Sequence, residues 1–424
     1  MEGRSRITRR LERASPAAFS LYAAIASFGA YFCMYAYRRP FAVGTYAGPS
    51  FLLGLDPKTT FLIAQVIGYA ASKFLGIKVI SELPAHRRAL GLAATIAMAE
   101  IALVLFAVLP PGFAAIALCL NGLSLGMVWG MVFGFLEGRR TSDFLGAALC
   151  ASFIVASGAV KTVGKALLDA GVAERWMPAT TGLLFAPAMA LSIYLLAQIP
   201  PPSALDEAAR AKRAPMNATE RSAFFMRFAG SLVPLVLAYV LLTALRDFRD
   251  SFAREIWDAL GFAGQPSVLT TTEIPVALGA LLGVASMSLV IDNRRALFAI
   301  HGLMMAGALL VLGATMMHRA GMLGPVPWMI ATGLGLYLGY VPFNCVLFDR
   351  LVTATGSIAT AGFLIYVADA SGYAGSVGLL LYKSLGTPDV PWVTFLEIFA
   401  MVSSAVAILL YVISAWTFAR RRSA

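Results

Sequence analysis

The chain has 424 residues, of which 59% are apolar and 13% are charged, and its mean hydropathy is +0.78. A soluble protein is about 45–50% apolar and about 25% charged. This composition excludes a soluble enzyme, a disordered chain and a nucleic-acid-binding module, because apolar side chains that find no core would face water. The net charge of +11 comes from short basic segments between apolar runs, which set membrane orientation. The composition therefore predicts a polytopic membrane protein.

The reactive side chains form no catalytic or metal-binding pattern. The four cysteines fall inside apolar runs, as small buried residues do. The three histidines are scattered without zinc-binding spacing, and the sequence has no Gly-x-x-x-x-Gly-Lys loop for ATP. No nucleophile–base pair recurs within the apolar runs. We therefore expect no enzymatic activity, no metal, no cofactor and no nucleic-acid partner.

Twelve apolar runs are long enough, at about 20 residues, to cross a membrane as helices. The first begins with Ser15 and Pro16 and the second with Asp56 and Pro57. A capping residue followed by proline at the first helical position favours a helix start. The first run is too long for a cleaved signal peptide, so we expect it to remain. The predicted spans are 16–38, 59–81, 88–109, 112–137, 144–168, 179–199, 227–247, 270–291, 296–317, 325–348, 356–382 and 391–418.

The loops between the spans carry most of their Lys and Arg on one side of the membrane. Because positively charged loops stay in the cytoplasm, both chain ends are predicted to be cytoplasmic, in a bacterial inner (plasma) membrane. A polar stretch that opens with three prolines divides the spans into two sets of six. The predicted domains are a tail over 1–15, a six-helix bundle over 16–199, a linker over 200–226, a second six-helix bundle over 227–418 and a tail over 419–424.

The two halves resemble each other in sequence. Residues 156–158 (ASG) in the fifth span recur as 370–372 in the eleventh, and 122–123 (GL) in the fourth recur as 335–336 in the tenth, at nearly the same spacing. Duplication of a six-span unit explains this pattern. Two parallel six-span halves describe the major facilitator fold, which binds substrate near the bilayer midplane between the halves. The predicted fold class is therefore an all-α membrane protein with twelve transmembrane helices in two pseudo-symmetric bundles.

The fourth span has a glycine at every fourth position, namely Gly122, Gly126, Gly130, Gly134 and Gly138. Glycines at this spacing share one helix face and let a neighbouring backbone approach closely. We interpret the glycines as a packing surface.

Several charged residues lie inside the predicted spans, where each costs roughly 2.5–3.5 kcal/mol near the bilayer centre and usually marks a pathway or a pair. Arg38 and Arg246 end the apolar runs of the first and seventh spans and are pseudo-symmetric, and Lys73 lies near the middle of the second. Three cations in one cavity would bind a doubly charged oxyanion, since arginine offers a planar fork and lysine a point charge. Alternatively, each cation reaches the interface or pairs structurally, as Asp247 beside Arg246 allows. Further charged residues inside spans are Glu100, Lys161, Asp369 and Glu397.

Three short segments carry a resemblance to a known family. Residues 35–42 (YAYRRPFA), 69–74 (YAASKF) and 242–246 (LTALR) resemble the first, second and seventh spans of the organophosphate:phosphate antiporters. The resemblance implies a divergent branch of this family within the major facilitator superfamily. It also implies that Arg38 and Arg246 clamp a phosphate group, with Lys73, Tyr35 and Tyr69 beside them: these five are the predicted substrate-binding residues.

The chain departs from this family in its fifth and eleventh spans. Val155 occupies the position of a histidine that aids substrate binding in the family, and its pseudo-symmetric position holds Asp369. Lys161 is an added cation further along the fifth span. Buried carboxylates can titrate near neutrality, so Asp369 and Lys161 are candidates for proton coupling. Alternatively, Asp369 neutralises Lys161 or Arg246 in a fixed pair.

The fourth and tenth spans offer two candidate cavity residues. Pro342 and Asn344 interrupt the regularity of the tenth span, and Trp129 occupies the position that matches Pro342. Asn344 and Trp129 either line the cavity or only pack, since neighbouring helices often satisfy irregular membrane helices.

The leading hypothesis is a monomeric secondary transporter, an antiporter or symporter, that moves a small organic anion by alternating access. A phosphate ester or phosphate is the substrate that the resemblance implies, and membrane lipid is the other partner. The alternatives are a non-transporting membrane sensor on the same fold and a proton-coupled transporter of a non-phosphate solute.

Overall fold

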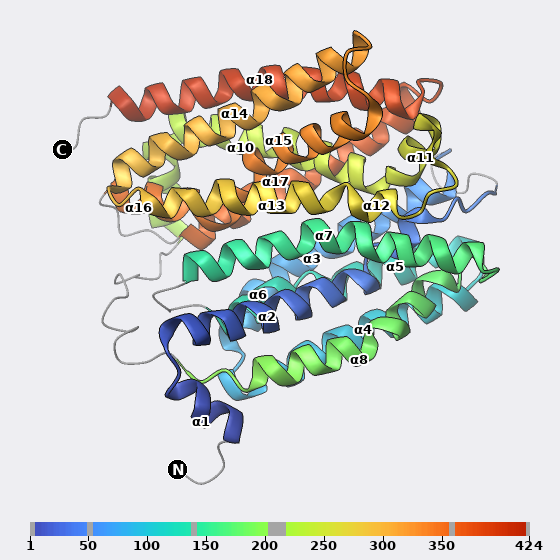
Figure 1. The fold of residues 1–424 in the computed structure, drawn as a ribbon, viewed down its shortest axis with the longest axis horizontal. Helices are drawn as coiled ribbons and strands as arrows, with labels where there is room; N and C mark the ends of the chain where they lie inside the picture. The colour runs from blue at the N-terminus through green and yellow to red at the C-terminus, as the bar shows by residue number, and fades with distance from the viewer. Residues whose placement is uncertain (1–4, 49–53, 137–141, 202–217, 356–360, 421–424) are drawn as a thin grey trace. The chain divides into compact units, whose positions relative to one another are not determined.

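The computed structural model divides into two compact units, unit 1 (Met1–Arg210) and unit 2 (Ala211–Ala424), whose regular elements are helices (Figure 1). The described residues are 5–48, 54–136, 142–201, 218–355 and 361–420. The α-helices of unit 1 are α1 (Arg6–Glu12), α2 (Pro16–Met34), α3 (Pro57–Glu82), α4 (Arg88–Val108), α5 (Pro111–Leu125), α6 (Val128–Phe133), α7 (Ser142–Asp169) and α8 (Met177–Ala197). Those of unit 2 are α10 (Ala218–Ser251), α11 (Ala253–Trp257), α12 (Val268–Thr271), α13 (Glu273–Ala285), α14 (Asn293–Arg319), α15 (Pro325–Cys345), α16 (Leu347–Ala354), α17 (Ala361–Leu381) and α18 (Trp392–Arg420).

In the described residues, every predicted span coincides with one of these helices or with consecutive helices; residue 137 of the fourth span and residues 356–360 of the eleventh lie outside them. By length and composition, 11 helical segments in the described part of the chain could cross a membrane. The further predicted span is α3, which is 26 residues long. The predicted all-helical membrane fold is therefore confirmed.

Both predicted proline-containing helix starts have the expected cap. The hydroxyl of Ser15 accepts a hydrogen bond from the backbone N–H of Ala18 at 3.2 Å, and Pro16 opens α2. The Oδ1 atom of Asp56 accepts from the backbone N–H of Thr59 at 2.9 Å. Each cap satisfies a donor that the first helical turn leaves unpaired.

The fourth and tenth spans are each formed by two consecutive helices. The fourth breaks after Leu125 and resumes at Val128 as α6, with Gly126 at the end of α5. A glycine loses more backbone entropy than other residues when it is fixed in a helix, so a helix is easily interrupted at Gly126. The tenth span does not break at Pro342, because α15 contains this proline and continues to Cys345. The span is instead interrupted just after Asn344, where α15 ends at Cys345 and α16 begins at Leu347.

Helices also form outside the predicted spans. α10 begins at Ala218, inside the predicted linker 200–226, of which 202–217 lie outside the described residues. Two short 3₁₀ helices follow α2: η1 (Tyr35–Tyr37) completes the first predicted span, and η2 (Pro40–Val43) lies beyond it. The first predicted site residues are Tyr35, in η1, and Arg38, directly after it.

The glycine face of the fourth span packs against α3. A Cβ atom on Gly122 would lie 2.1 Å from the carbonyl oxygen of Gln65, and one on Gly68 would lie 1.9 Å from that of Cys119. Real Cβ atoms essentially never lie this close to another heavy atom, so the two helix backbones are in direct contact, as glycine permits. The interpretation as a packing surface is confirmed at Gly122, whereas Gly138 lies outside the described residues.

The variant Gly122→Ala is expected to lower the free energy of unfolding by about 1–3 kcal/mol, because the atom it meets belongs to a backbone that cannot swing away. Thermal unfolding of the purified protein in detergent measures this loss. Gly112→Ala on the same helix is the matched control, since nothing lies within 4 Å of its Cβ position and alanine favours a helix over glycine. Equal stability of the two variants would contradict the close contact of α3 and α5.

Candidate functional site

The first predicted clamp residue, Arg38, ends the 3₁₀ helix η1. Its backbone N–H donates to the carbonyl of Tyr35 at 3.0 Å, and its own carbonyl accepts from Nε2 of Gln65 at 3.1 Å. The side chain is 4% exposed, and its guanidinium carbon lies 3.8 Å from the ring centre of Tyr69 and 5.9 Å from that of Tyr35. A guanidinium that lies on an aromatic face directs its N–H groups to the side, where the oxygens of an anion can accept them.

Lys73 joins this group from α3, one helical turn after Tyr69. Its Nζ lies 5.6 Å from the ring centre of Tyr69. The structure thus brings together four of the five predicted substrate-binding residues, Arg38, Tyr35, Tyr69 and Lys73, which we call the unit 1 cluster. Their role in substrate binding remains a prediction.

Aromatic side chains extend the unit 1 cluster along α2. Tyr31 lies one turn before Tyr35, with ring centres 5.7 Å apart, and makes edge-to-face contact with Trp129 at 5.2 Å and with Phe153 at 6.5 Å. Trp129, a predicted cavity residue, therefore connects to the cluster through a tyrosine that the sequence analysis did not select.

Lys161, the predicted coupling lysine, is 3% exposed on α7. The same helix packs against the segment after Arg38, because a Cβ atom on Gly164 would meet Val43 of η2 at 3.3 Å. The next lysine, Lys165, forms an ion pair with Asp169 of the same helix at 2.5 Å. The structure therefore places Lys161 on a helix that supports the unit 1 cluster, and its coupling role stays a prediction.

The segment that carries Arg38 is anchored at its far end by one carboxylate. Glu174 accepts hydrogen bonds from the backbone N–H and the hydroxyl of Thr45 and from the backbone N–H of Tyr46. Burial, and then the charge of Glu174, raise the pKa of the Tyr46 phenol well above its ordinary value. The backbone of Tyr46 is in the left-handed region, with φ of 48°. These contacts fix the loop that leads away from the cluster.

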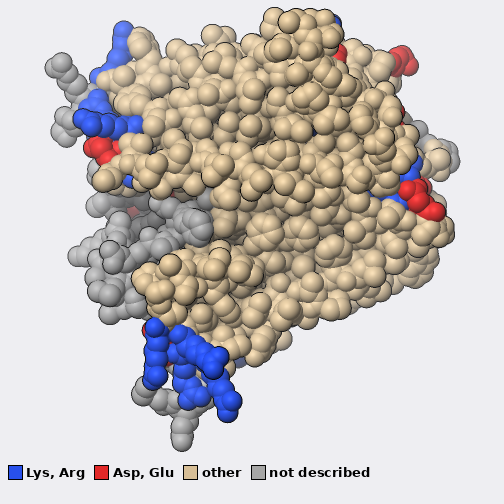
Figure 2. All heavy atoms as spheres, viewed as in Figure 1, with Lys and Arg blue, Asp and Glu red and all other residues tan. Residues whose placement is uncertain are grey.

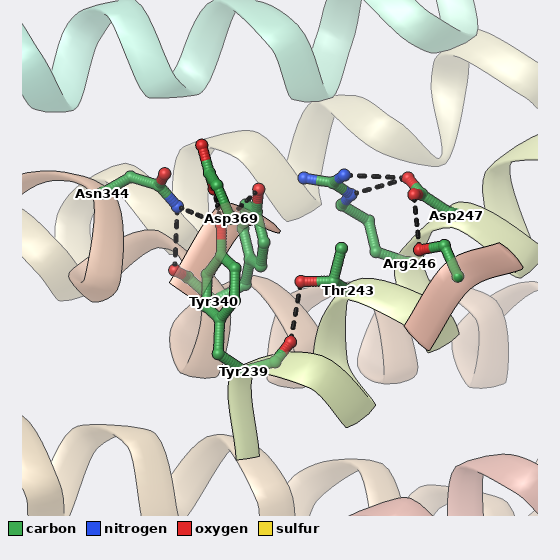
Figure 3. Close-up of polar contacts among 8 residues, drawn as sticks. Tyr239, Thr243, Arg246, Asp247, Tyr340, Asn344 and Asp369 are labelled. Atoms are coloured by element: carbon green, nitrogen blue, oxygen red, sulfur yellow. Dashed lines mark hydrogen bonds and ion pairs between the residues drawn. The ribbon is translucent and has the colours of Figure 1, made fainter. Parts of the chain in front are cut away.

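In unit 2 the equivalent arginine, Arg246, lies on α10 and forms an ion pair with the next residue. Its Nε and Nη2 donate to Oδ1 of Asp247 at 3.2 and 2.8 Å, and Oδ2 of Asp247 accepts from the hydroxyl of Ser376 at 2.8 Å (Figure 3). The guanidinium carbon lies 4.3 Å from the ring centre of Tyr340. The structural pairing that the sequence left open is therefore present at Arg246, while its remaining nitrogen, Nη1, points away from Asp247 (Figure 3).

Asp369, the predicted coupling acid, lies on α17 and accepts a hydrogen bond from the hydroxyl of Tyr239 at 2.5 Å (Figure 3). That hydroxyl is 3.0 Å from the hydroxyl of Tyr340, and the two rings stack with centres 5.0 Å apart. The side-chain amide of Asn344, a predicted cavity residue, donates to the Tyr239 hydroxyl at 3.4 Å. We call the following residues the unit 2 cluster: Tyr239, Arg246, Asp247, Tyr340, Asn344 and Asp369.

Three tyrosines in these clusters were missed by the sequence analysis, although a signal for one pair existed. Tyr31 precedes Arg38 by about two helical turns, and Tyr239 precedes Arg246 by the same spacing. The offset that pairs the two arginines therefore also pairs these tyrosines. Tyr340 has no such signal, because its position emerges only from the packing of α15 against α10.

The two clusters differ in their charge. The unit 1 cluster places two cations, Arg38 and Lys73, against aromatic rings. The unit 2 cluster combines one guanidinium with two carboxyl groups, Asp247 and Asp369, and with hydroxyl and amide groups. The first is suited to an anionic group, and the second to a polar group that hydrogen-bonds.

Comparisons with known proteins address the fold and the family. No curated protein matches the chain. A solved structure that matches is a crystal structure of a mutant of the nucleoside transporter NupG, with a TM-score of 0.59 and 12% identity, over 94% of this chain and 99% of that one. At this identity the likeness shows the fold alone, which is the major facilitator fold, and the antiporter branch stays a prediction. A family pattern matches residues 40–421, so the chain belongs to the family described as "Family of unknown function (DUF5690)".

Proposed function

We propose that the protein is a secondary transporter that moves a small organic anion, a phosphate ester, by alternating access. One observation carries this proposal: each unit buries an arginine against a tyrosine at the end of a membrane-spanning segment. Arg38 is 4% exposed and Arg246 is 9% exposed. A buried guanidinium is costly in a membrane and is retained where it serves a substrate or a pair. The fold, shared with a transporter, supports the same function.

The chemistry of the unit 1 cluster suits a phosphate group. Arg38 offers a planar fork for two phosphate oxygens, and Lys73 adds a second positive charge without a fixed geometry. The Tyr69 ring supports both cations, at 3.8 Å from the guanidinium carbon and 5.6 Å from the ammonium. Binding of a dianion would neutralise the charges of both cations.

The unit 2 cluster argues for an ester rather than for inorganic phosphate. Asp247 already balances the charge of Arg246, so this cluster adds little net attraction for a second anionic group. Its Tyr239 and Tyr340 hydroxyls and the Asn344 amide can instead bind the hydroxyl groups of an organic moiety. We propose that the phosphate group is recognised by the unit 1 cluster.

Coupling is proposed to use Asp369, with Lys161 as the second candidate. Asp369 is 6% exposed and is hydrogen-bonded to a tyrosine that contacts the ring under Arg246. A change in the charge of Asp369 would therefore alter the electrostatic surroundings of Arg246, the proposed substrate-binding arginine.

A second candidate function is proton-coupled transport of a neutral solute. The ion pair of Arg246 with Asp247 favours this second function, because the pair has no net positive charge to attract an anion. The stacked Tyr239 and Tyr340 rings would suit a planar or hydroxylated solute. A nucleoside has both features, and NupG is a nucleoside transporter.

Thermal stability of the purified protein against a panel of ligands separates these functions. The panel contains phosphate, glycerol phosphate, sugar phosphates, di- and monocarboxylates, nucleosides and neutral sugars. A ligand at about 100 times its dissociation constant stabilises the folded state by about 2.7 kcal/mol. We expect a shift with phosphate esters; a shift with nucleosides or sugars alone would select the second candidate.

The variant Arg38→Gln tests whether the shift comes from the unit 1 cluster. We expect it to lose the shift with phosphate esters, whereas Arg87→Gln, which removes the same charge from an exposed position on η3 (Ala85–Arg87), should keep it. Counterflow of the identified ligand in proteoliposomes then distinguishes a transporter from a sensor. Binding without counterflow would exclude the proposed transport.

A further inference from the structure

Four arginines cover one side of α1. Figure 2 shows Lys and Arg side chains gathered over this helix. At about 100° per residue, the four fall within an arc of roughly 100° around the helix axis. The exposed arginines are Arg6, Arg9, Arg10 and Arg13.

The opposite side of α1 is attached to the rest of unit 1. Ile7, Thr8 and Leu11 lie on this side and are half-buried. The hydroxyl of Thr8 donates to the backbone oxygen of Gln198, which follows α8, at 3.0 Å, and the hydroxyl of Ser5 donates to the side-chain oxygen of the same glutamine. Ser5 also caps α1. The helix is therefore held in one orientation, with its arginines outward.

α1 lies at the boundary of the membrane because two spans end beside it. A short turn connects Arg13 to Pro16, the first residue of the first span. Gln198 caps α8, the sixth span, at its C-terminus. The outward arginines are therefore close to the depth at which lipid headgroups begin. Arginine forks match phosphate oxygens, and basic residues near an anionic surface attract it.

We propose that α1 is a binding surface for the headgroups of anionic phospholipids. The membrane's own lipid is the occupant, because a short turn holds the helix at the end of a span. Orientation during insertion requires only that the charges be present. It does not require that they share one helix face, or that Ser5 and Thr8 fix the opposite face to Gln198. The proposal does not depend on the transported substrate.

Lipid retention by the full-length protein tests the proposal. The protein is purified in an uncharged detergent and exposed to an equimolar mixture of phosphatidylglycerol and phosphatidylcholine, and the lipids that remain bound are counted by native mass spectrometry. We expect the wild type to retain phosphatidylglycerol preferentially. The double variant Arg9→Gln/Arg10→Gln should lower this preference on the order of tenfold.

The matched control is Arg294→Gln/Arg295→Gln, which removes two exposed arginines from the start of α14. It should change the preference by less than about twofold, since each charge acts only within about a Debye length. Both variants should unfold at the wild-type temperature in detergent. Equal losses in the two double variants would overturn the proposal. The proposal would also be overturned if the wild type showed no preference for phosphatidylglycerol. The same holds if its preference were unchanged at about 1 M salt, where charges are screened beyond about 3 Å.

Discussion

Replacing Arg246 with alanine is expected to abolish substrate binding and to lower the free energy of unfolding by about 3–5 kcal/mol. The stability loss arises because the variant removes the cation from beside Asp247, a carboxylate that is 4% exposed. The binding loss arises because a truncated buried charge that contacts a ligand costs at least about 2 kcal/mol, or roughly 30-fold in affinity. A single variant confounds these two effects, since a partly unfolded protein also binds nothing.

The double variant Arg246→Ala/Asp247→Ala separates the two roles of this arginine. The double variant leaves no unpaired buried charge, so the thermal unfolding temperature should recover toward that of the wild type, less the cost of the cavity that two alanines leave. Binding of the phosphate ester, measured by titration calorimetry on the same preparations, should stay lost if Nη1 of Arg246 contacts substrate. Recovery of both stability and binding in the double variant would make the Arg246–Asp247 pair structural and would favour a substrate without charge.

The helices were predictable because their signal is local. An apolar run of about 20 residues must satisfy its backbone hydrogen bonds internally in lipid, and a helix does this. Ser15 and Asp56 add caps that require only their own neighbours. The break between Leu125 and Val128 was not predictable, since Gly126 fits both a packing glycine and a helix end. Contact of α5 with α3 selects between these interpretations, and it is not visible in a single segment.

The site was predictable where charge marked it. Arg38, Arg246 and Lys73 are conspicuous in apolar runs, and the resemblance to a family added Tyr35 and Tyr69. The other aromatic residues carry no charge and look like ordinary membrane packing in the sequence. Tyr340 becomes part of a cluster only because α15 packs against α10, which places its ring under Arg246. Residue chemistry can therefore be read from sequence, whereas pairing across helices requires the fold.

Replacing Asp369 with asparagine is expected to preserve substrate binding and to remove the pH dependence of transport. A tyrosine hydroxyl has one proton to donate, so Tyr239 donates either to Asp369 at 2.5 Å or to Tyr340 at 3.0 Å. An ionised Asp369 selects the first arrangement, and a protonated one donates to Tyr239 and permits the second. The charge of Asp369 thus reaches Tyr340, whose ring lies 4.3 Å from the guanidinium carbon of Arg246. Asparagine keeps the size and the acceptor but cannot take up a proton.

Uptake into proteoliposomes, measured against external pH with and without a proton gradient, tests this link between Asp369 and the arginine. Tyr239→Phe should weaken the pH dependence as well, because it retains the acid but cuts the connection to Tyr340. Tyr411→Phe is the matched control, since its buried hydroxyl makes no hydrogen bond to the described residues, and it should behave as the wild type. Unchanged pH dependence in Asp369→Asn would end the coupling role. If Asp369→Asn lost the pH dependence of transport and Tyr239→Phe fully retained it, Asp369 would remain the proton site. Its effect on Arg246 would then require a route other than Tyr239.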